Sequence, residues 1–167
     1  MKFSSQEEYG LRCLLRIARE GRATGLTIPE ISEAEGISTF YVAKLMRVLR
    51  RGGLVKSSRG KIGGYTLSRP PDKIVVGEAL AVLGDRLFES DFCDDHAGAE
   101  KICTRSVDCS IRSLWQAVQH MVDRVLSKTT LADLLGSEHE VGIIMSPLVQ
   151  LDGASRPLSG SAAEKVR

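Results

Sequence analysis

The chain has 167 residues, of which 43% are hydrophobic and 26% charged, a balance typical of one globular protein with an ordinary core. It has no apolar run of about eighteen residues, which excludes a membrane-spanning helix, and its start lacks the apolar core of a signal peptide. We therefore expect a cytoplasmic protein. In that compartment the four cysteines stay reduced and suit a metal or redox site better than disulfides.

Positive charge is concentrated in one part of the chain. Positions 41–69 hold eight basic residues and no acidic residue, whereas positions 70–109 hold nine acidic and four basic residues. The formal net charge of the whole chain is only +2. This local basic block therefore predicts that one surface of the protein binds a polyanion such as DNA.

The first helix is predicted to begin at Ser5, because Ser5 and Glu8 have the spacing of a capping box. Apolar residues then recur at intervals of three and four until Gly21 provides a stop. Cys13 lies among these apolar positions, so we expect it in the core and not in a binding site. Capping accounts for Glu8 without any further role.

A second and a third helix follow, separated by a turn that contains glycine. Thr27 and Glu30 form another capping box, and this second helix ends at Gly36. Ser38 caps the third helix, which ends at Gly52. Two helices joined in this way predict a helix-turn-helix, in which the second is the recognition helix and its first exposed residues face base edges.

Two short strand-like runs, 54–58 and 65–68, flank a glycine-rich basic turn at 59–64. They predict a β-hairpin directly after the recognition helix, which is the arrangement of a DNA-binding wing. The polar and basic residues of the third helix and of this turn could be ordinary solvated charges or simple helix caps. We prefer to interpret them as contacts to phosphates or bases. The candidate DNA-binding residues are Ser38, Thr39, Tyr41, Lys44, Arg47, Arg59, Gly60 and Lys61.

The pair Pro70 and Pro71 interrupts the chain after the hairpin, and a short apolar-faced helix is predicted at 76–83. We therefore expect residues 1–84 to form one winged helix-turn-helix domain. The whole chain is predicted to be mainly α with a small β-hairpin wing, followed by a long C-terminal dimerisation helix.

A long amphipathic helix dominates residues 110–135, with Asp108 or Ser110 as its cap and a short helix after it at 130–135. The preceding domain already has its own core. A second copy of the helix is then the simplest cover for its apolar stripe, which predicts a homodimer. Residues 136–167 lose the periodicity, and we expect them to form a disordered tail.

Three cysteines, Cys93, Cys103 and Cys109, fall within residues 85–109, a polar loop that we predict to bind a cofactor. Thiolates suit iron–sulfur clusters, because soft sulfur ligands match iron in a sulfide cage. Zinc is an open alternative, since His96 would complete a tetrahedral set with the three thiols. A thiol switch without any metal is another.

Three features together resemble a known family: the opening at 9–12 (Tyr-Gly-Leu-Arg), the wing at 59–67 and the cysteines ahead of a long helix. Over residues 1–135 the chain is similar to the iron–sulfur-cluster winged-helix transcriptional regulators that include IscR, NsrR and RirA. The resemblance implies a homodimeric regulator, with repression the favoured action, that binds double-stranded operator DNA. It also implies an iron–sulfur cluster, [4Fe-4S] in preference to [2Fe-2S], as the sensor of nitric oxide, iron or redox state.

The resemblance places the cluster on the three cysteines. The five residues between Cys103 and Cys109 match the family spacing, whereas the nine between Cys93 and Cys103 exceed it. Arg112 stands where some members have a histidine ligand. Glu8 matches the acidic residue of the first helix that other members donate from the second subunit, so the resemblance implies Glu8 as the fourth ligand.

The sequence contains no motif that indicates an enzyme. No nucleophile–base pair and no phosphate-binding loop followed by a helix is present, so we expect that the protein is not an enzyme. An interaction module that uses its helix-turn-helix to bind a protein instead of DNA is the remaining rival.

Overall fold

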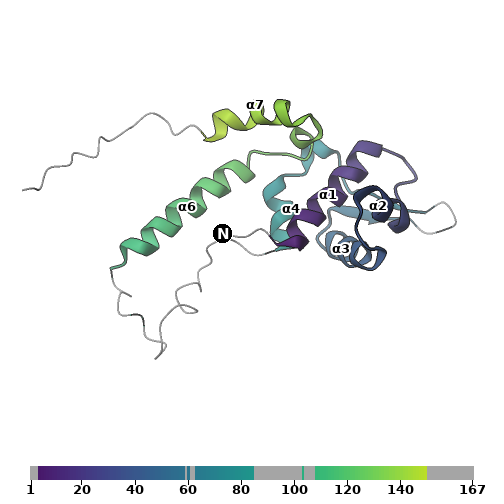
Figure 1. The fold of residues 1–167 in the computed structure, drawn as a ribbon, viewed down its shortest axis with the longest axis horizontal. Helices are drawn as coiled ribbons and strands as arrows, with labels where there is room; N and C mark the ends of the chain where they lie inside the picture. The colour runs from purple at the N-terminus through teal and green to yellow at the C-terminus, as the bar shows by residue number, and fades with distance from the viewer. Residues whose placement is uncertain (1–3, 59, 61–62, 85–102, 104–107, 150–167) are drawn as a thin grey trace, which may run out of the picture.

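The computed structural model describes residues 4–58, 60, 63–84, 103 and 108–149. The chain is mostly helical with one small two-stranded sheet, as predicted (Figure 1). In chain order the elements are α1 (Ser5–Glu20), α2 (Ile28–Glu35), α3 (Thr39–Arg51), β1 (Val55–Ser57), β2 (Tyr65–Leu67), η1 (Pro71–Lys73), α4 (Val76–Leu83), α6 (Ser110–Leu126), η2 (Asp133–Leu135) and α7 (Glu138–Val149). We call residues 4–84 the reader, and α6 with α7 the arm.

Helix α1 is capped one residue earlier than predicted. The Ser4 hydroxyl accepts from the Glu7 amide at 3.3 Å, and the Glu7 carboxylate accepts from the Ser4 amide at 2.6 Å. The predicted Ser5–Glu8 box is therefore wrong. Both serine–glutamate pairs have the same spacing, so the local sequence does not distinguish them. In the same turn, the Gln6 side-chain amide donates to the Leu83 carbonyl at the end of α4. Glu8 is left exposed and outside the cap.

Helices α2 and α3 begin and end where the sequence predicts. Thr27 and Glu30 form the capping box of α2, which ends at Gly36 in the left-handed conformation with φ 66°. The Ser38 hydroxyl accepts from the Tyr41 amide at 3.3 Å and caps α3. The short turn between the two helices gives the predicted helix-turn-helix.

The hairpin after α3 is the predicted wing. Strands β1 and β2 pair antiparallel, with Val55 opposite Leu67 and Ser57 opposite Tyr65. A further bridge joins Tyr65 to Leu26, in the segment that leads into α2. A side chain at Gly64 would lie 2.9 Å from the Leu26 backbone, so the close approach of the two segments requires glycine there. The Leu26–Tyr65 bridge thus joins the wing to the helix-turn-helix.

The core lies inside the reader, with one contribution from beyond α6. The Leu131 amide donates to the Ile74 carbonyl at 2.9 Å, and the Leu131 side chain is fully buried. Cys13 is also fully buried, which confirms its predicted place in the core. The buried apolar residues are Cys13, Leu14, Ile17, Leu26, Ile31, Ile37, Val42, Leu45, Met46, Leu49, Leu54, Val55, Ile74, Val76, Ala79, Leu83 and Leu131.

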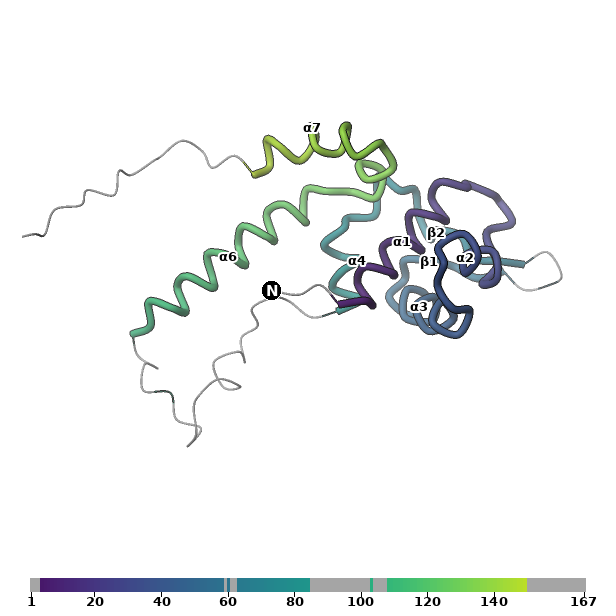
Figure 2. The backbone as a smooth tube through the Cα atoms, viewed as in Figure 1, coloured from purple at the N-terminus to yellow at the C-terminus, as the bar shows by residue number. Residues whose placement is uncertain are grey.

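Helix α6 runs away from the α1–α3 cluster (Figure 2) and begins at an unexpected cap. The Cys109 sulfur accepts from the Arg112 amide at 3.4 Å, so the predicted cap by Asp108 or Ser110 is wrong. The sulfur occupies the position of the usual capping oxygen. Among the described residues of α6, only Gln119 is buried.

Helix α7 lies within the region that we expected to be disordered, so that expectation is wrong for Glu138–Val149. The Ser137 amide donates to the Glu140 carboxylate at 2.7 Å, and the Glu140 amide donates to the Ser137 hydroxyl at 3.4 Å. This capping box, together with packing against α6, starts a helix without a strong apolar stripe. Residues 150–167 lie outside the described residues.

The terminal helix predicted at 130–135 is shorter than expected, because only Asp133–Leu135 form a 3-10 turn. The Asp133 carboxylate accepts from both the amide and the hydroxyl of Thr130, at 2.8 and 2.7 Å, which holds the segment as a turn. Across the parts of the chain that the structure describes, no helix is long and apolar enough to cross a membrane.

Candidate nucleic-acid interface and sensory site

Helix α3 has one buried face and one exposed basic face. The buried face packs into the core through Val42, Leu45, Met46 and Leu49. On the opposite side Lys44 and Arg47 are exposed, as are Ser38 and Thr39 at its start. All four candidate residues are therefore accessible, and α3 carries no acidic residue to repel a phosphate backbone.

Tyr41, the remaining α3 candidate, lies at the junction with α1 and is half-buried. Its ring meets the Tyr9 ring edge-to-face, with centroids 5.9 Å apart and planes at 89°. The Lys44 ammonium lies 5.6 Å from the Tyr41 ring centroid, and the Arg12 guanidinium 5.5 Å from that of Tyr9. Such contacts stabilise the start of the recognition helix against α1.

A partly buried ion-pair cluster fixes α2 to α1. The Glu35 carboxylate, whose side chain is 11% exposed, accepts from Arg12 Nε at 3.0 Å and from Arg16 Nε at 2.7 Å. Arg12 also donates to the Glu35 carbonyl at 2.6 Å, at the C-terminal end of α2. Two cations at a helix C-terminus complement the helix dipole as well as the carboxylate.

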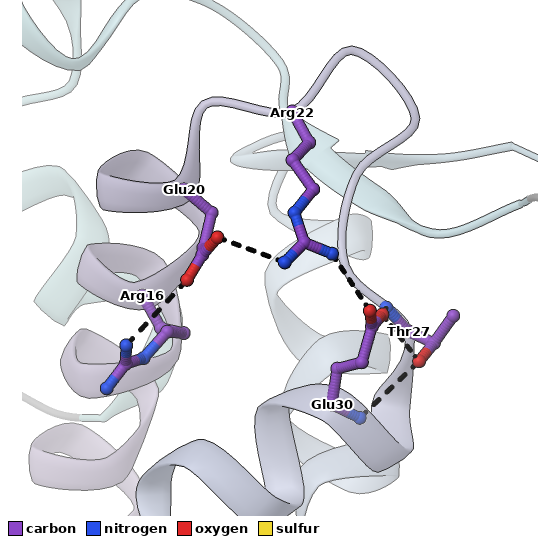
Figure 3. Close-up of polar contacts among 5 residues, drawn as sticks. All are labelled: Arg16, Glu20, Arg22, Thr27 and Glu30. Atoms are coloured by element: carbon purple, nitrogen blue, oxygen red, sulfur yellow. Dashed lines mark hydrogen bonds and ion pairs between the residues drawn. The ribbon is translucent and has the colours of Figure 1, made fainter.

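A second chain of ion pairs joins the opposite end of α2 to α1 (Figure 3). Arg22 lies between two carboxylates, 3.2 Å from Glu20 and 3.0 Å from Glu30. Glu20 in turn lies 4.0 Å from Arg16. The backbone and side-chain hydrogen bonds from Thr27, and then the Arg22 guanidinium, lower the pKa of Glu30. Together with the Glu35 cluster, these contacts hold α2 at both ends.

The wing candidates are only partly within the described residues. Gly60 is exposed and has φ 114°, a conformation that favours glycine at a hairpin tip. Arg59 and Lys61 lie outside the described residues. At the end of β1 nearer the turn, the Ser57 hydroxyl accepts from Arg50 of α3 at 3.3 Å. This contact links the recognition helix to β1.

The predicted cofactor ligands fall partly within the described residues. Cys103 and Cys109 are half-buried, and Cys93 lies outside the described residues. Within the described part of the chain, no three His, Cys, Asp or Glu side chains lie together as a metal site. Cys109 sits at the N-terminus of α6, where the helix dipole and the Arg112 amide interact favourably with negative charge on sulfur.

Glu8 lies in the first turn of α1, directly after Glu7. The neighbouring side chains hold this end of α1 against α4, because Gln6 donates to the Leu83 carbonyl and the Glu7 side chain packs at Gly84. Gly84 is the last described residue before the segment that contains Cys93. The first turn of α1, which carries the exposed Glu8, is therefore held against the end of α4 through Gln6 and Glu7.

Cys13 differs from the other described cysteines. Burial, and secondarily the negative charge of Glu35, raises the pKa of its thiol to about 12. The thiol therefore stays protonated and unreactive at neutral pH, because the thiolate is the nucleophile and the metal ligand. The structure thus separates the buried Cys13 from Cys103 and Cys109, which are half-buried.

Comparison with known proteins identifies the family. Residues 3–137 match the family Rrf2, described as iron-dependent transcriptional regulators. The chain belongs to the Rrf2 family. This confirms the resemblance found in the sequence, since the IscR proteins of several Escherichia coli strains are among its relatives.

Individual Rrf2-family relatives agree with this assignment. Protein rrf2 of Nitratidesulfovibrio vulgaris is 35% identical over 135 residues, covering 81% of this chain and 87% of the relative. The solved structure of T. potens IscR is 33% identical with a TM-score of 0.63, covering 81% and 86% of the two chains. That of CymR, named as the global cysteine regulator of B. subtilis, is 31% identical with a TM-score of 0.65, covering 81% and 96%.

The family settles the general function of the chain. The protein is a DNA-binding transcriptional regulator with the winged-helix fold, and its relatives are regulators and not enzymes. Two features of this Rrf2-family reader were not predicted from the sequence. The Glu35 cluster joins residues far apart along the chain, so it had no local signal. Phe40 is exposed at the start of α3, and its helical spacing from Val42 and Leu45 was the signal that could have indicated this.

Proposed function

We propose that this Rrf2-family regulator binds operator DNA as a homodimer, and that an iron–sulfur cluster on Cys93, Cys103 and Cys109 sets its affinity. Glu8 from the second subunit is the proposed fourth ligand, [4Fe-4S] the favoured cluster, and repression the favoured action. Nitric oxide, iron and oxidant are the candidate signals. The observation that carries the proposal is that Glu8 is exposed and released from capping, while Cys109 starts the exposed helix α6.

DNA binding uses α3 and the wing in this proposal. The exposed residues at the start of α3 face base edges in the major groove, and Lys44 and Arg47 contact phosphates. Arg59, Gly60 and Lys61 of the wing contact the adjacent backbone or minor groove. Two-fold symmetry then predicts a near-palindromic operator with half-sites about one helical turn, roughly 34 Å, apart.

The homodimer forms through α6. Leu114 and Trp115 on this helix are 56% and 41% exposed in the single chain, although both are large apolar side chains. A second copy of the same stripe buries them in an isologous interface. A Glu8 ligand from the second subunit requires in addition that the first helix of one subunit lie near the cysteines of the other.

The donor set fits a cluster. Three thiols supply soft ligands for iron, and the α6 N-terminus interacts favourably with negative charge on the Cys109 sulfur. The Glu8 carboxylate is a hard oxygen ligand and therefore the weakest of the four, which suits a position that a small molecule must reach. A bound cluster would supply reactivity toward nitric oxide or oxidant, and the chain would couple it to α6 through Cys109.

Anaerobic purification followed by native mass spectrometry tests the cluster. We expect a brown dimer whose mass includes one iron–sulfur cluster per subunit. Cys103→Ser should remove the cluster, while Cys13→Ser, which changes only a core thiol, should retain it. A colourless protein that holds zinc, or no metal at all, would contradict the proposal.

Glu8 has a matched control in its neighbour. Glu8→Ala should shorten the lifetime of the cluster under air while leaving the thermal midpoint nearly unchanged, because Glu8 does not cap α1. Glu7→Ala should do the reverse, because Glu7 completes the cap and such caps contribute about 1 kcal/mol. Equal cluster lifetimes in the two variants would remove Glu8 from the ligand set.

A thiol or zinc switch on the same DNA-binding fold is the second candidate function. The observation that favours it is the B. subtilis relative, 32% identical over 134 residues, whose structure is named as that of a global cysteine regulator. In that case DNA affinity would change with the oxidation of Cys103 and Cys109 in protein free of iron. Operator binding measured before and after treatment with peroxide and then thiol distinguishes the two candidates.

A further inference from the structure

Phe40 is an apolar side chain in an unusual place. It is the second residue of α3, and 83% of its surface is exposed, more than for any other large apolar residue among those described. It points away from the core because the buried face of α3 runs through Val42 and Leu45, about half a helical turn from Phe40. Single exposed apolar residues are common on proteins, so its position, and not its exposure alone, carries the inference.

The position of Phe40 is that of a base-reading residue. The first turn of the second helix in a helix-turn-helix is the part that meets base edges. Lys44 and Arg47 follow four and seven residues later, so they lie on the same side of α3 as Phe40 and are also exposed. Phosphate contacts by these two cations would therefore hold the Phe40 ring against the floor of the major groove.

The chemistry of the Phe40 ring favours contact with one of the four DNA bases. A phenyl group neither donates nor accepts hydrogen bonds, so it cannot pair with the polar edges of adenine, guanine or cytosine. Thymine alone presents an apolar group in the major groove, its C5-methyl, and phenylalanine is among the side chains that contact it. Against any other base, the ring would cover a polar edge without satisfying it.

We propose that Phe40 reads the C5-methyl group of one thymine in each operator half-site and is a specificity-determining residue of this regulator. The inference rests on the proposed function, in that α3 enters the major groove, and adds the base class that it selects. It concerns the sequence preference of the regulator and is independent of what the cysteines bind.

The test uses the full-length protein, purified anaerobically, and an operator selected from a random pool of duplex DNA. Each thymine of the selected operator is replaced in turn by deoxyuridine, which lacks only the C5-methyl group. We expect one position per half-site at which the replacement weakens binding about fourfold, the effect of removing one buried methyl group. Phe40→Ala should bind the thymine and deoxyuridine operators equally well.

Lys44→Ala is the matched control. It should weaken binding to both operators and reduce the salt dependence, while the fourfold preference for thymine remains. Because Phe40 is exposed, Phe40→Ala should keep the wild-type thermal midpoint, which separates a loss of readout from a loss of folding.

Two results would overturn the inference while leaving DNA binding intact. One is a wild-type protein that tolerates deoxyuridine at every position, as expected if the ring wedges between bases or docks on a protein. Another is Phe40→Ala protein that keeps the thymine preference, which would assign the readout to another side chain such as Thr39. If the wild-type protein enriches no DNA sequence at all, operator binding itself fails and the inference fails with it.

Discussion

The reader and the arm place their apolar side chains in opposite ways. Among the described residues, every buried apolar side chain except Leu131 lies between Cys13 and Leu83, around one core of the reader. In the arm, by contrast, Leu114, Trp115 and Ile143 are largely exposed. Local helix signals do not explain the difference, since both regions use capping boxes. The reader therefore buries its apolar side chains within one chain, whereas those of the arm stay exposed in one chain and are the ones that the proposed homodimer would cover.

The largest expected effect comes from placing a charge on the arm. Leu114→Asp should convert the proposed dimer into a monomer, because each of two copies loses roughly 2 kcal/mol of apolar burial. The dimer dissociation constant should rise about a thousandfold, which sedimentation equilibrium measures. Gln116→Asp, the same charge at an exposed polar position of α6, should leave the dimer intact. A dimeric Leu114→Asp protein would show that the interface lies elsewhere.

The core of the reader gives the next largest effect. Leu45→Ala should lower the free energy of unfolding by about 3 kcal/mol, since Leu45 is fully buried and truncation leaves a cavity. Ile143→Ala in the arm should change it by less than about 0.5 kcal/mol in the single chain, because this side chain is exposed. Urea unfolding of each variant measures the difference. Similar losses at the two sites would contradict the contrast between reader and arm.

The ion pairs that orient α2 contribute less. Glu35→Gln should destabilise the reader by about 1–2 kcal/mol, because it weakens partly buried charge-assisted hydrogen bonds to Arg12 and Arg16. Glu33→Gln, at an exposed position of the same helix, is the control and should have little effect. Chemical denaturation of both variants, at low and at high salt, measures their free energies of unfolding. A Glu35→Gln protein as stable as wild type would show that packing alone fixes α2.

The smallest effect is a pH dependence at the start of α2. Hydrogen bonds from Thr27 keep the pKa of Glu30 below its ordinary value of 4.5 in the folded chain. The stability that this cap contributes is therefore present above pH 4.5 and is lost as the pH falls through the lower folded-state pKa. An NMR titration of the Glu30 side-chain carbon should follow that shift. Thr27→Ala should return the pKa toward 4.5.

Features that depend on neighbours along the chain could be predicted from the sequence. The caps at Thr27 and Ser38, the turn at Gly36 and the hairpin after α3 each depend on residues a few positions apart. Their hydrogen bonds form within one or two turns of backbone, so the local residue order specifies them. The helix-turn-helix, the wing and the exposed basic face of α3 followed from these local signals.

Where the local sequence allowed more than one structure, the folded chain showed which one forms. Either serine–glutamate pair could cap α1 by its spacing, and the structure uses Ser4 with Glu7. Helix α7 also formed where disorder was predicted; it packs against α6, and its Ser137–Glu140 capping box was a local signal that the weak apolar periodicity concealed. The sequence by itself determined a winged helix-turn-helix with a cysteine-containing segment before a long helix. Only the folded structure showed that Ser4, and not Ser5, caps α1, which leaves Glu8 outside the cap. Only packing brings Glu35 to Arg12 and Arg16, because these residues are far apart in the chain.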